Sequence, residues 1–108
     1  MNFLPLELIL NDLKRFGEPL KERYNLDSIE IYIEETDVDE RLFIGHSFSI
    51  MGIQGTASLP YFKNNNGELA IDENEKHWKL NLNESKTDGY RTIGDVFDFV
   101  RGVINTHE

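Results

Sequence analysis

The chain has 108 residues, with 11 Lys or Arg against 20 Asp or Glu, so its formal net charge is -9. It holds no cysteine, which excludes disulfides and thiol chemistry, and its length predicts a single domain over residues 1–108. The negative charge disfavours nucleic acid, because proteins hold phosphate backbones chiefly with Lys and Arg.

No segment predicts contact with a membrane. A spanning helix needs roughly 18 consecutive apolar residues, and no apolar run approaches this length. The first 17 residues have no basic start and carry Glu7 and Asp12 within their apolar stretch, so they do not predict a signal peptide. We therefore expect a cytoplasmic protein.

The first predicted element is an amphipathic helix that begins at Pro5. Its apolar residues recur at helical spacing, with polar side chains opposite them. This stripe consists of Leu6, Ile9, Leu10, Leu13 and Phe16. Gly17 and Pro19 predict the end of the helix, with a further turn or two over residues 19–24.

An acidic segment follows, from Asp27 to Glu40. It holds seven acidic residues and no basic one, whereas the rest of the chain has 13 acids and 11 bases. Ile29, Ile31 and Ile33 alternate with polar residues in its first half, which predicts a half-buried strand with an acidic outer face. This strand leads into an acidic loop over residues 35–40. The negative charge is therefore concentrated on one surface.

The middle of the chain predicts a series of strands without crossover helices. We expect a long strand over residues 41–53, a hairpin over 56–71 with its turn at 64–67, and a strand over 77–82. A polar turn separates the last two of these elements. Residues 83–91 are polar and predict a loop.

The last predicted element is a helix that begins at Thr92. Asp95, three residues later, completes an N-terminal capping signature. One face of the helix is apolar and consists of Ile93, Val96, Phe97, Val100, Val103 and Ile104. The whole pattern predicts an α+β fold: a mainly antiparallel sheet of four or five strands, with one face covered by the N-terminal and C-terminal helices.

The sequence predicts no catalytic residue. His46 lies beside Ser47, but adjacent residues of a strand point to opposite faces, so the two do not form a dyad. The acids that begin at Asp37 resemble the start of a calcium loop, yet Leu42 and Phe48 occupy the positions of its Gly and Glu. We expect no metal and no cofactor.

The acidic segment is the predicted binding surface. A rigid strand that carries carboxylates attracts a cationic partner, and we expect this partner to be a basic protein. Tyr32 is the expected aromatic anchor, since interface energy concentrates in Tyr, Trp and Arg. The predicted contact residues are Glu30, Tyr32, Glu34, Glu35, Asp37, Asp39 and Glu40. The alternative is that this charge only keeps the domain soluble.

In size, acidity and architecture the chain resembles bacterial toxin-immunity proteins, including those of contact-dependent growth inhibition. This resemblance implies a cytoplasmic inhibitor that caps a basic nuclease toxin with acidic residues. Acidic α/β chaperones of secretion systems are similar at the same level, although they usually have a helix within the strand order. A chaperone would expose an apolar patch, with Leu4, Leu8 and Phe99 as candidates. A third hypothesis is a small enzyme or ligand-binding domain with its pocket near His46.

Overall fold

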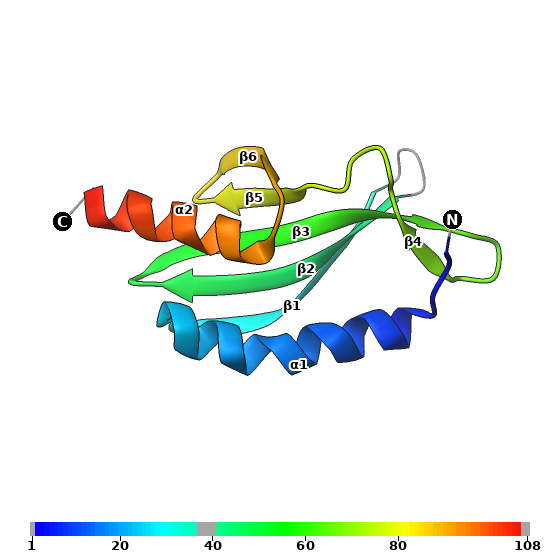
Figure 1. The fold of residues 1–108 in the computed structure, drawn as a ribbon, viewed down its shortest axis with the longest axis horizontal. Helices are drawn as coiled ribbons and strands as arrows, with labels where there is room; N and C mark the ends of the chain where they lie inside the picture. The colour runs from blue at the N-terminus through cyan, green and yellow to red at the C-terminus, as the bar shows by residue number, and fades with distance from the viewer. Residues whose placement is uncertain (1, 37–40, 107–108) are drawn as a thin grey trace.

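Both helices lie on one face of an antiparallel sheet (Figure 1). The computed structural model describes residues 2–36 and 41–106, and within them the sheet has six strands. The elements are α1 (Leu6–Tyr24), β1 (Ser28–Glu35), β2 (Arg41–Ile50), β3 (Ile53–Lys63), β4 (Leu69–Ile71), β5 (Trp78–Leu82), β6 (Ser85–Tyr90) and α2 (Ile93–Thr106). Their order in the sheet is β1-β2-β3-β5-β6, and β4 pairs with the end of β3. The predicted α+β class and element order are confirmed.

The first helix is longer than the sequence predicted. It continues through Gly17 and Pro19 to Tyr24, where Asn25 adopts a left-handed conformation (φ 55°) and its N–H bonds the carbonyl of Lys21. Proline costs an interior helix one hydrogen bond. Tyr24 is buried beyond that point, so packing of the last turn against the sheet outweighs the local preference to stop.

The predicted strand over residues 41–53 is in fact interrupted. Met51 and Gly52, with φ of 50° and 82°, form the tight turn that joins β2 to β3. Positive φ at both central residues suits the right-handed twist of a hairpin. Methionine rarely adopts this conformation, which is why the sequence did not show the turn.

The predicted polar loop over residues 83–91 is also wrong, because it contains β6. Asn83 and Glu84, with φ of 48° and 73°, turn the chain back so that β6 pairs with β5. Residues 85–89 are all exposed. A strand that buries so little shows no apolar alternation, which explains why the sequence predicted at most five strands.

The main core lies between α2 and the sheet. Val96, Phe97 and Val100 are 0% exposed. The ring of Phe97 stacks on Tyr24 at 5.0 Å and meets the edge of Phe48 at 4.9 Å, which joins both helices to β2. The predicted cap at the start of α2 is confirmed, since the N–H of Asp95 donates to Oγ1 of Thr92 at 3.1 Å.

A buried ion pair links the β4–β5 connection to β2. Asp72 is 1% exposed, and its carboxylate lies 3.2 Å from the guanidinium of Arg41. The same guanidinium bonds the exposed carboxylate of Glu75 at 2.8 Å. The N–H of Asn74 donates to the other oxygen of Asp72 at 3.0 Å. This pair therefore orients the loop that follows β4.

We expect Asp72→Asn to destabilise the fold by about 3 kcal/mol, at the lower end of the range for breaking a buried pair. The lower end applies because 25% of the Arg41 side chain is exposed and it keeps Glu75. Glu75→Gln, which removes the exposed partner, should cost less than about 1 kcal/mol. Urea unfolding measures both. Equal losses in the two variants would contradict the assigned role of Asp72.

Candidate functional site

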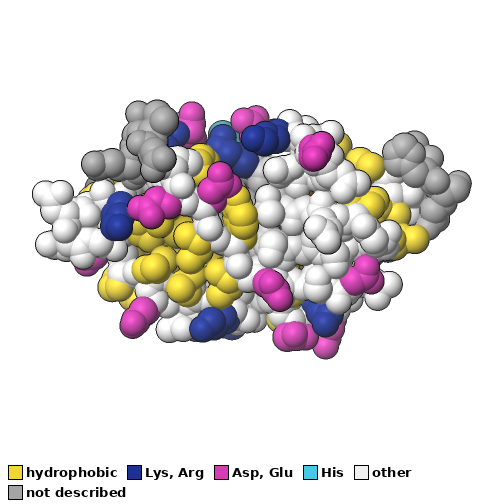
Figure 2. Space-filling model, turned by 180° about the vertical axis from the view of Figure 1, so that it is seen from behind, with side chains coloured by type: hydrophobic (Ala, Val, Ile, Leu, Met, Phe, Trp, Pro, Cys, Tyr) yellow, Lys and Arg dark blue, Asp and Glu magenta, His cyan; other side chains and the backbone are white. Residues whose placement is uncertain are grey.

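The sheet face that carries no helix, called the open face below, collects polar side chains of five strands. On β1 Ile29 packs against the main core, whereas Ile33, on the same helix-bearing side, is 44% exposed. By alternation, Glu30, Tyr32 and Glu34 take the open face. Figure 2 views the molecule from this side. Apolar side chains gather over one half of the view, and uncharged polar atoms cover most of the other half.

The predicted contact residues do not all share this face. Glu35 follows Glu34 in the strand and therefore lies on the opposite, helix-bearing face, where its carboxylate is 4.0 Å from Nζ of Lys63. Asp37, Asp39 and Glu40 lie outside the described residues. Of the four predicted contact residues that the structure describes, Glu30, Tyr32 and Glu34 therefore share the open face and Glu35 does not.

Tyr32 and Glu34 act as a pair on the open face. The phenol O–H of Tyr32 donates to a carboxylate oxygen of Glu34. The pKa of Tyr32 rises to about 12, first because partial burial disfavours the tyrosinate and then because of the hydrogen bond and negative charge of Glu34. The hydrogen bond holds the ring of Tyr32 in one orientation at the face.

Two hollows lie side by side on the open face. The first, of about 410 Å³, includes Tyr32, Glu34 and Phe43 on one side and Lys79 and Lys86 on the other. The second, of about 570 Å³, is mostly polar. Its wall includes Ser28, Glu30, Ser47, Ser49, Gln54, Thr56, Asn81 and Asn83. Hydroxyl and amide groups of this kind accept and donate hydrogen bonds, so the face suits a polar partner surface.

Acidic and basic side chains lie at opposite edges of the open face. The carboxylates of Glu30 and Glu34 lie on β1, at one edge of the sheet. Lys79 and Lys86 lie at the other edge, on β5 and β6, and Lys79 is 3.5 Å from the carboxylate of Asp88. Sequence reasoning missed Lys86 because it placed residues 83–91 in a loop. The pairing of β5 with β3 brings Lys79 to this face, and the pairing of β6 with β5 brings Lys86.

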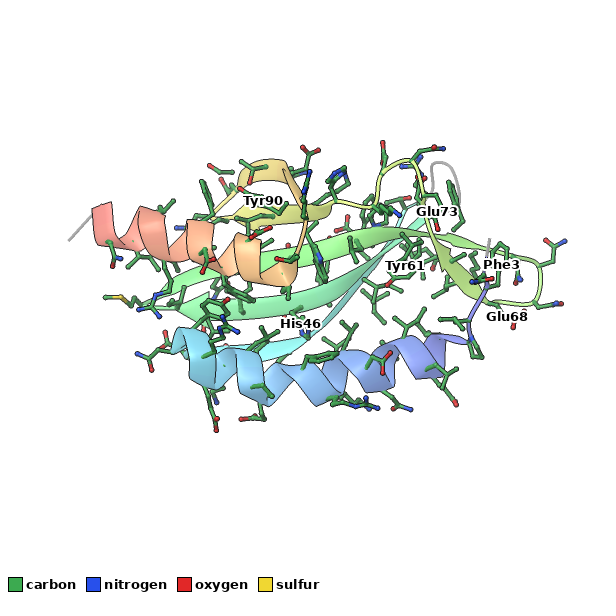
Figure 3. The ribbon with its side chains drawn as sticks, viewed as in Figure 1. Phe3, His46, Tyr61, Glu68, Glu73 and Tyr90 are labelled. Atoms are coloured by element: carbon green, nitrogen blue, oxygen red, sulfur yellow. The ribbon has the colours of Figure 1, made fainter. Side chains whose placement is uncertain are left out.

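His46 faces the helices instead of a hollow (Figure 3). It is 3% exposed, and its side chain makes no hydrogen bond or ion pair with any described residue. Burial lowers the pKa of His46 below its usual 6.5. Ser47 lies on the open face, as the alternation predicts, so the two residues form no dyad. His46 lies in the wall of neither hollow of the open face.

The exposed apolar residues named for a chaperone do not gather in one place. Leu4 and Leu8 lie at the start of α1, where the backbone of Leu4 pairs with that of Leu69. Phe99 lies on α2 and packs against Tyr90 with ring centres 5.7 Å apart. Figure 1 shows the start of α1 and the helix α2 near opposite ends of the sheet.

Within the described residues, no group of three or more His, Asp or Glu side chains is arranged to hold a metal ion. In the same part of the chain, no helix combines the length and apolar character needed to cross a membrane.

The chain belongs to the DUF5634 family, a family of unknown function that matches residues 3–100. No curated protein matches the chain. The matched range includes every strand, all of α1 and the first half of α2, so it contains the whole of the open face.

The hydrogen bond between Tyr32 and Glu34 predicts a distinct alkaline titration. Absorbance at 295 nm should show one tyrosine that ionises near pH 12 and is lost in Tyr32→Phe. Glu34→Gln should lower this pKa only part of the way toward 10.0, because burial is the larger cause and remains. Glu35→Gln, on the opposite face, should leave it unchanged. An unaltered titration in Glu34→Gln would exclude the pairing.

Burial of His46 predicts a loss of stability in mild acid. Its folded pKa lies below its unfolded pKa, so the unfolded chain binds more protons between those two values. Stability should therefore fall as the pH drops through 6.5 and below. In His46→Leu the urea midpoint should fall less between pH 7 and pH 5 than in the parent protein. An equal fall of the midpoint in His46→Leu and in the parent protein would contradict this prediction.

Proposed function

We propose that this protein is a non-catalytic binding module whose open face contacts a basic protein. The observation that carries the proposal is that Glu30, Tyr32 and Glu34 share one helix-free face beside two hollows. A sheet face without a covering helix is free to meet another molecule. The predicted acidic surface is thus narrower than the acidic segment of the sequence.

Charge supports a cationic partner at the β1 edge. The carboxylates of Glu30 and Glu34 are exposed and belong to a strand paired along its length with β2. Rigidly presented charges of one sign accelerate encounter with an oppositely charged surface and select against like-charged ones. The rest of the chain is also net negative, so it adds to the attraction of a cationic partner.

Aromatic side chains supply the contact area. Tyr32 is half-exposed and oriented by Glu34, and Phe43 lies beside it in the wall of the same hollow. Aromatic residues are enriched at the centres of protein interfaces, because they bury much area at a small cost in conformational entropy. We assign Tyr32 as the anchor of the interface.

The lysines at the other edge restrict how the partner binds. A basic surface that covered the whole open face would meet Lys79 and Lys86. Like-charge contacts of this kind disfavour such a pose. The partner therefore places its cationic groups over β1 and neutral or acidic groups over β5 and β6.

The finer proposal is an immunity protein, which occupies the phosphate-binding site of a nuclease toxin in the cytoplasm. A nuclease must be electropositive where it holds phosphates, and carboxylates on a rigid strand mimic that charge. Glu30 and Glu34 are well placed for this role, whereas Glu35 points away from it. Asp37, Asp39 and Glu40 stay in the proposal on sequence grounds alone.

Charge reversal on the two faces tests the binding surface. Glu30→Lys with Glu34→Lys should abolish capture of basic proteins from lysate of the native cells, as quantified by mass spectrometry. The control, Glu22→Lys with Glu35→Lys, makes the same change in net charge with one residue on α1 and the other on the helix-bearing face. It should retain the capture. Loss of capture in both variants, or in neither, would show that the acid serves only solubility.

A second measurement tests the immunity role itself. The captured basic protein should cleave nucleic acid when alone and lose this activity when one equivalent of the parent chain is added. The open-face variant should fail to inhibit at the same ratio. Binding without inhibition would support the protein-binding role and contradict the immunity role.

A further inference from the structure

The helix-bearing face of the sheet is not completely covered. The strands β2 and β3 have 10 and 11 residues, a length of about 33 to 36 Å, whereas the 14 residues of α2 span about 21 Å. Helix α2 therefore covers only one end of these strands. At the other end a cleft of about 540 Å³ lies between the first half of α1, the end of β3, and β4.

The cleft has an apolar interior. Ile44 and Leu69 at its base are 1% exposed, and Leu13, Leu59 and Trp78 contribute to its walls. Its volume falls in the range of about 300 to 1,000 Å³ that is typical of small-molecule sites. The sequence placed Phe16 in the buried stripe of the first helix, but Phe16 lines this cleft and is 55% exposed.

Three titratable side chains converge on the cleft from different elements. Asp12 belongs to α1, Tyr61 to β3 and Glu73 to the β4–β5 connection. Figure 3 shows Tyr61 in the space between β3 and the first half of α1, with Glu73 at the edge of this space. The pKa of Tyr61 is raised by burial and by the charge of Asp12, so the field of Asp12 reaches the phenol.

The charge of the cleft is negative. No Lys, Arg or His lies among its lining residues. Asp12 is 3.8 Å from Arg15 and Glu73 is 3.2 Å from Lys76, but all four side chains are mostly exposed. Exposed pairs of this kind contribute little to stability and are screened by salt. A fatty carboxylate would meet two like charges here, whereas a cation would meet two opposite ones.

We propose that this cleft binds a small organic ammonium ion with an apolar body. The body lies against Leu13, Leu59 and Trp78, and the ammonium group is placed between Asp12 and Glu73, within reach of the Tyr61 hydroxyl. The site is on the opposite side of the sheet from the open face. The proposal is therefore independent of the protein-binding role.

Trp78 makes the proposal directly measurable, because it is the single tryptophan of the chain and lines the cleft. The probes are 4-phenylbutylamine and 4-phenylbutyrate, which share an apolar body and differ in charge. Titration with the amine should change the tryptophan emission to saturation. The carboxylate should bind at least about tenfold more weakly, as expected for two partly screened charge interactions.

Variants then separate the cleft from the rest of the surface. Asp12→Asn with Glu73→Gln should weaken amine binding by about tenfold while the urea midpoint stays close to that of the parent. The matched control, Glu22→Gln with Asp98→Asn, removes two exposed acids that do not line the cleft and should bind the amine unchanged.

Three results would overturn the proposal. One is equal binding of the two probes, and another is unchanged amine binding in the Asp12 and Glu73 variant. The third is a sedimentation experiment that shows a dimer dissociated by Phe16→Lys, because a second copy of the chain would then cover the cleft. Leu59→Phe, which fills the cleft, should weaken binding of the amine. If the Leu59→Phe protein does not fold, the variant with Asp12→Asn and Glu73→Gln decides the question.

Discussion

The alternation of apolar and polar side chains along β1, β2 and β3 is the constraint on which the rest of the structure depends. It gives the sheet one mostly apolar face, which must be removed from water, and one face whose hydroxyl, amide and carboxylate groups can stay in water beside Tyr32 and Phe43. Both helices pack on the apolar face because this face must be buried. Phe97 shows how, since it contacts Tyr24 of α1 and Phe48 of β2 at once. The open face stays uncovered because its polar groups are stable in water.

Both proposed sites follow from this division. The open face is available because its hydroxyl, amide and carboxylate groups are stable in water, and Tyr32 and Phe43 add contact area to it. The cleft exists because α2 is too short to cover the apolar, helix-bearing face to its end. A partner protein and a small cation would thus meet opposite sides of one sheet. The buried pair of Arg41 and Asp72 orients the loop after β4, which carries Glu73 to the cleft.

Sequence reasoning succeeded where one residue pattern had a single structural solution. The β1 strand and the cap at Thr92 were both correct, as was the placement of His46 and Ser47 on opposite faces, although Ile33 of the predicted apolar face is 44% exposed. It failed where burial or backbone conformation decided the outcome. The turn at Met51 needs a positive φ that methionine rarely adopts, and β6 has no apolar alternation.

For the candidate site, the sequence by itself determined the composition of β1 and the concentration of negative charge near it. Alternation also places Glu35 opposite Glu34, because neighbouring residues of any strand face opposite ways. Only the tertiary structure decided that Lys79 shares the face of Glu30, since strand order depends on packing between distant segments. The cleft likewise has no signature in the sequence. It results from the difference in length between a helix and the strands beneath it.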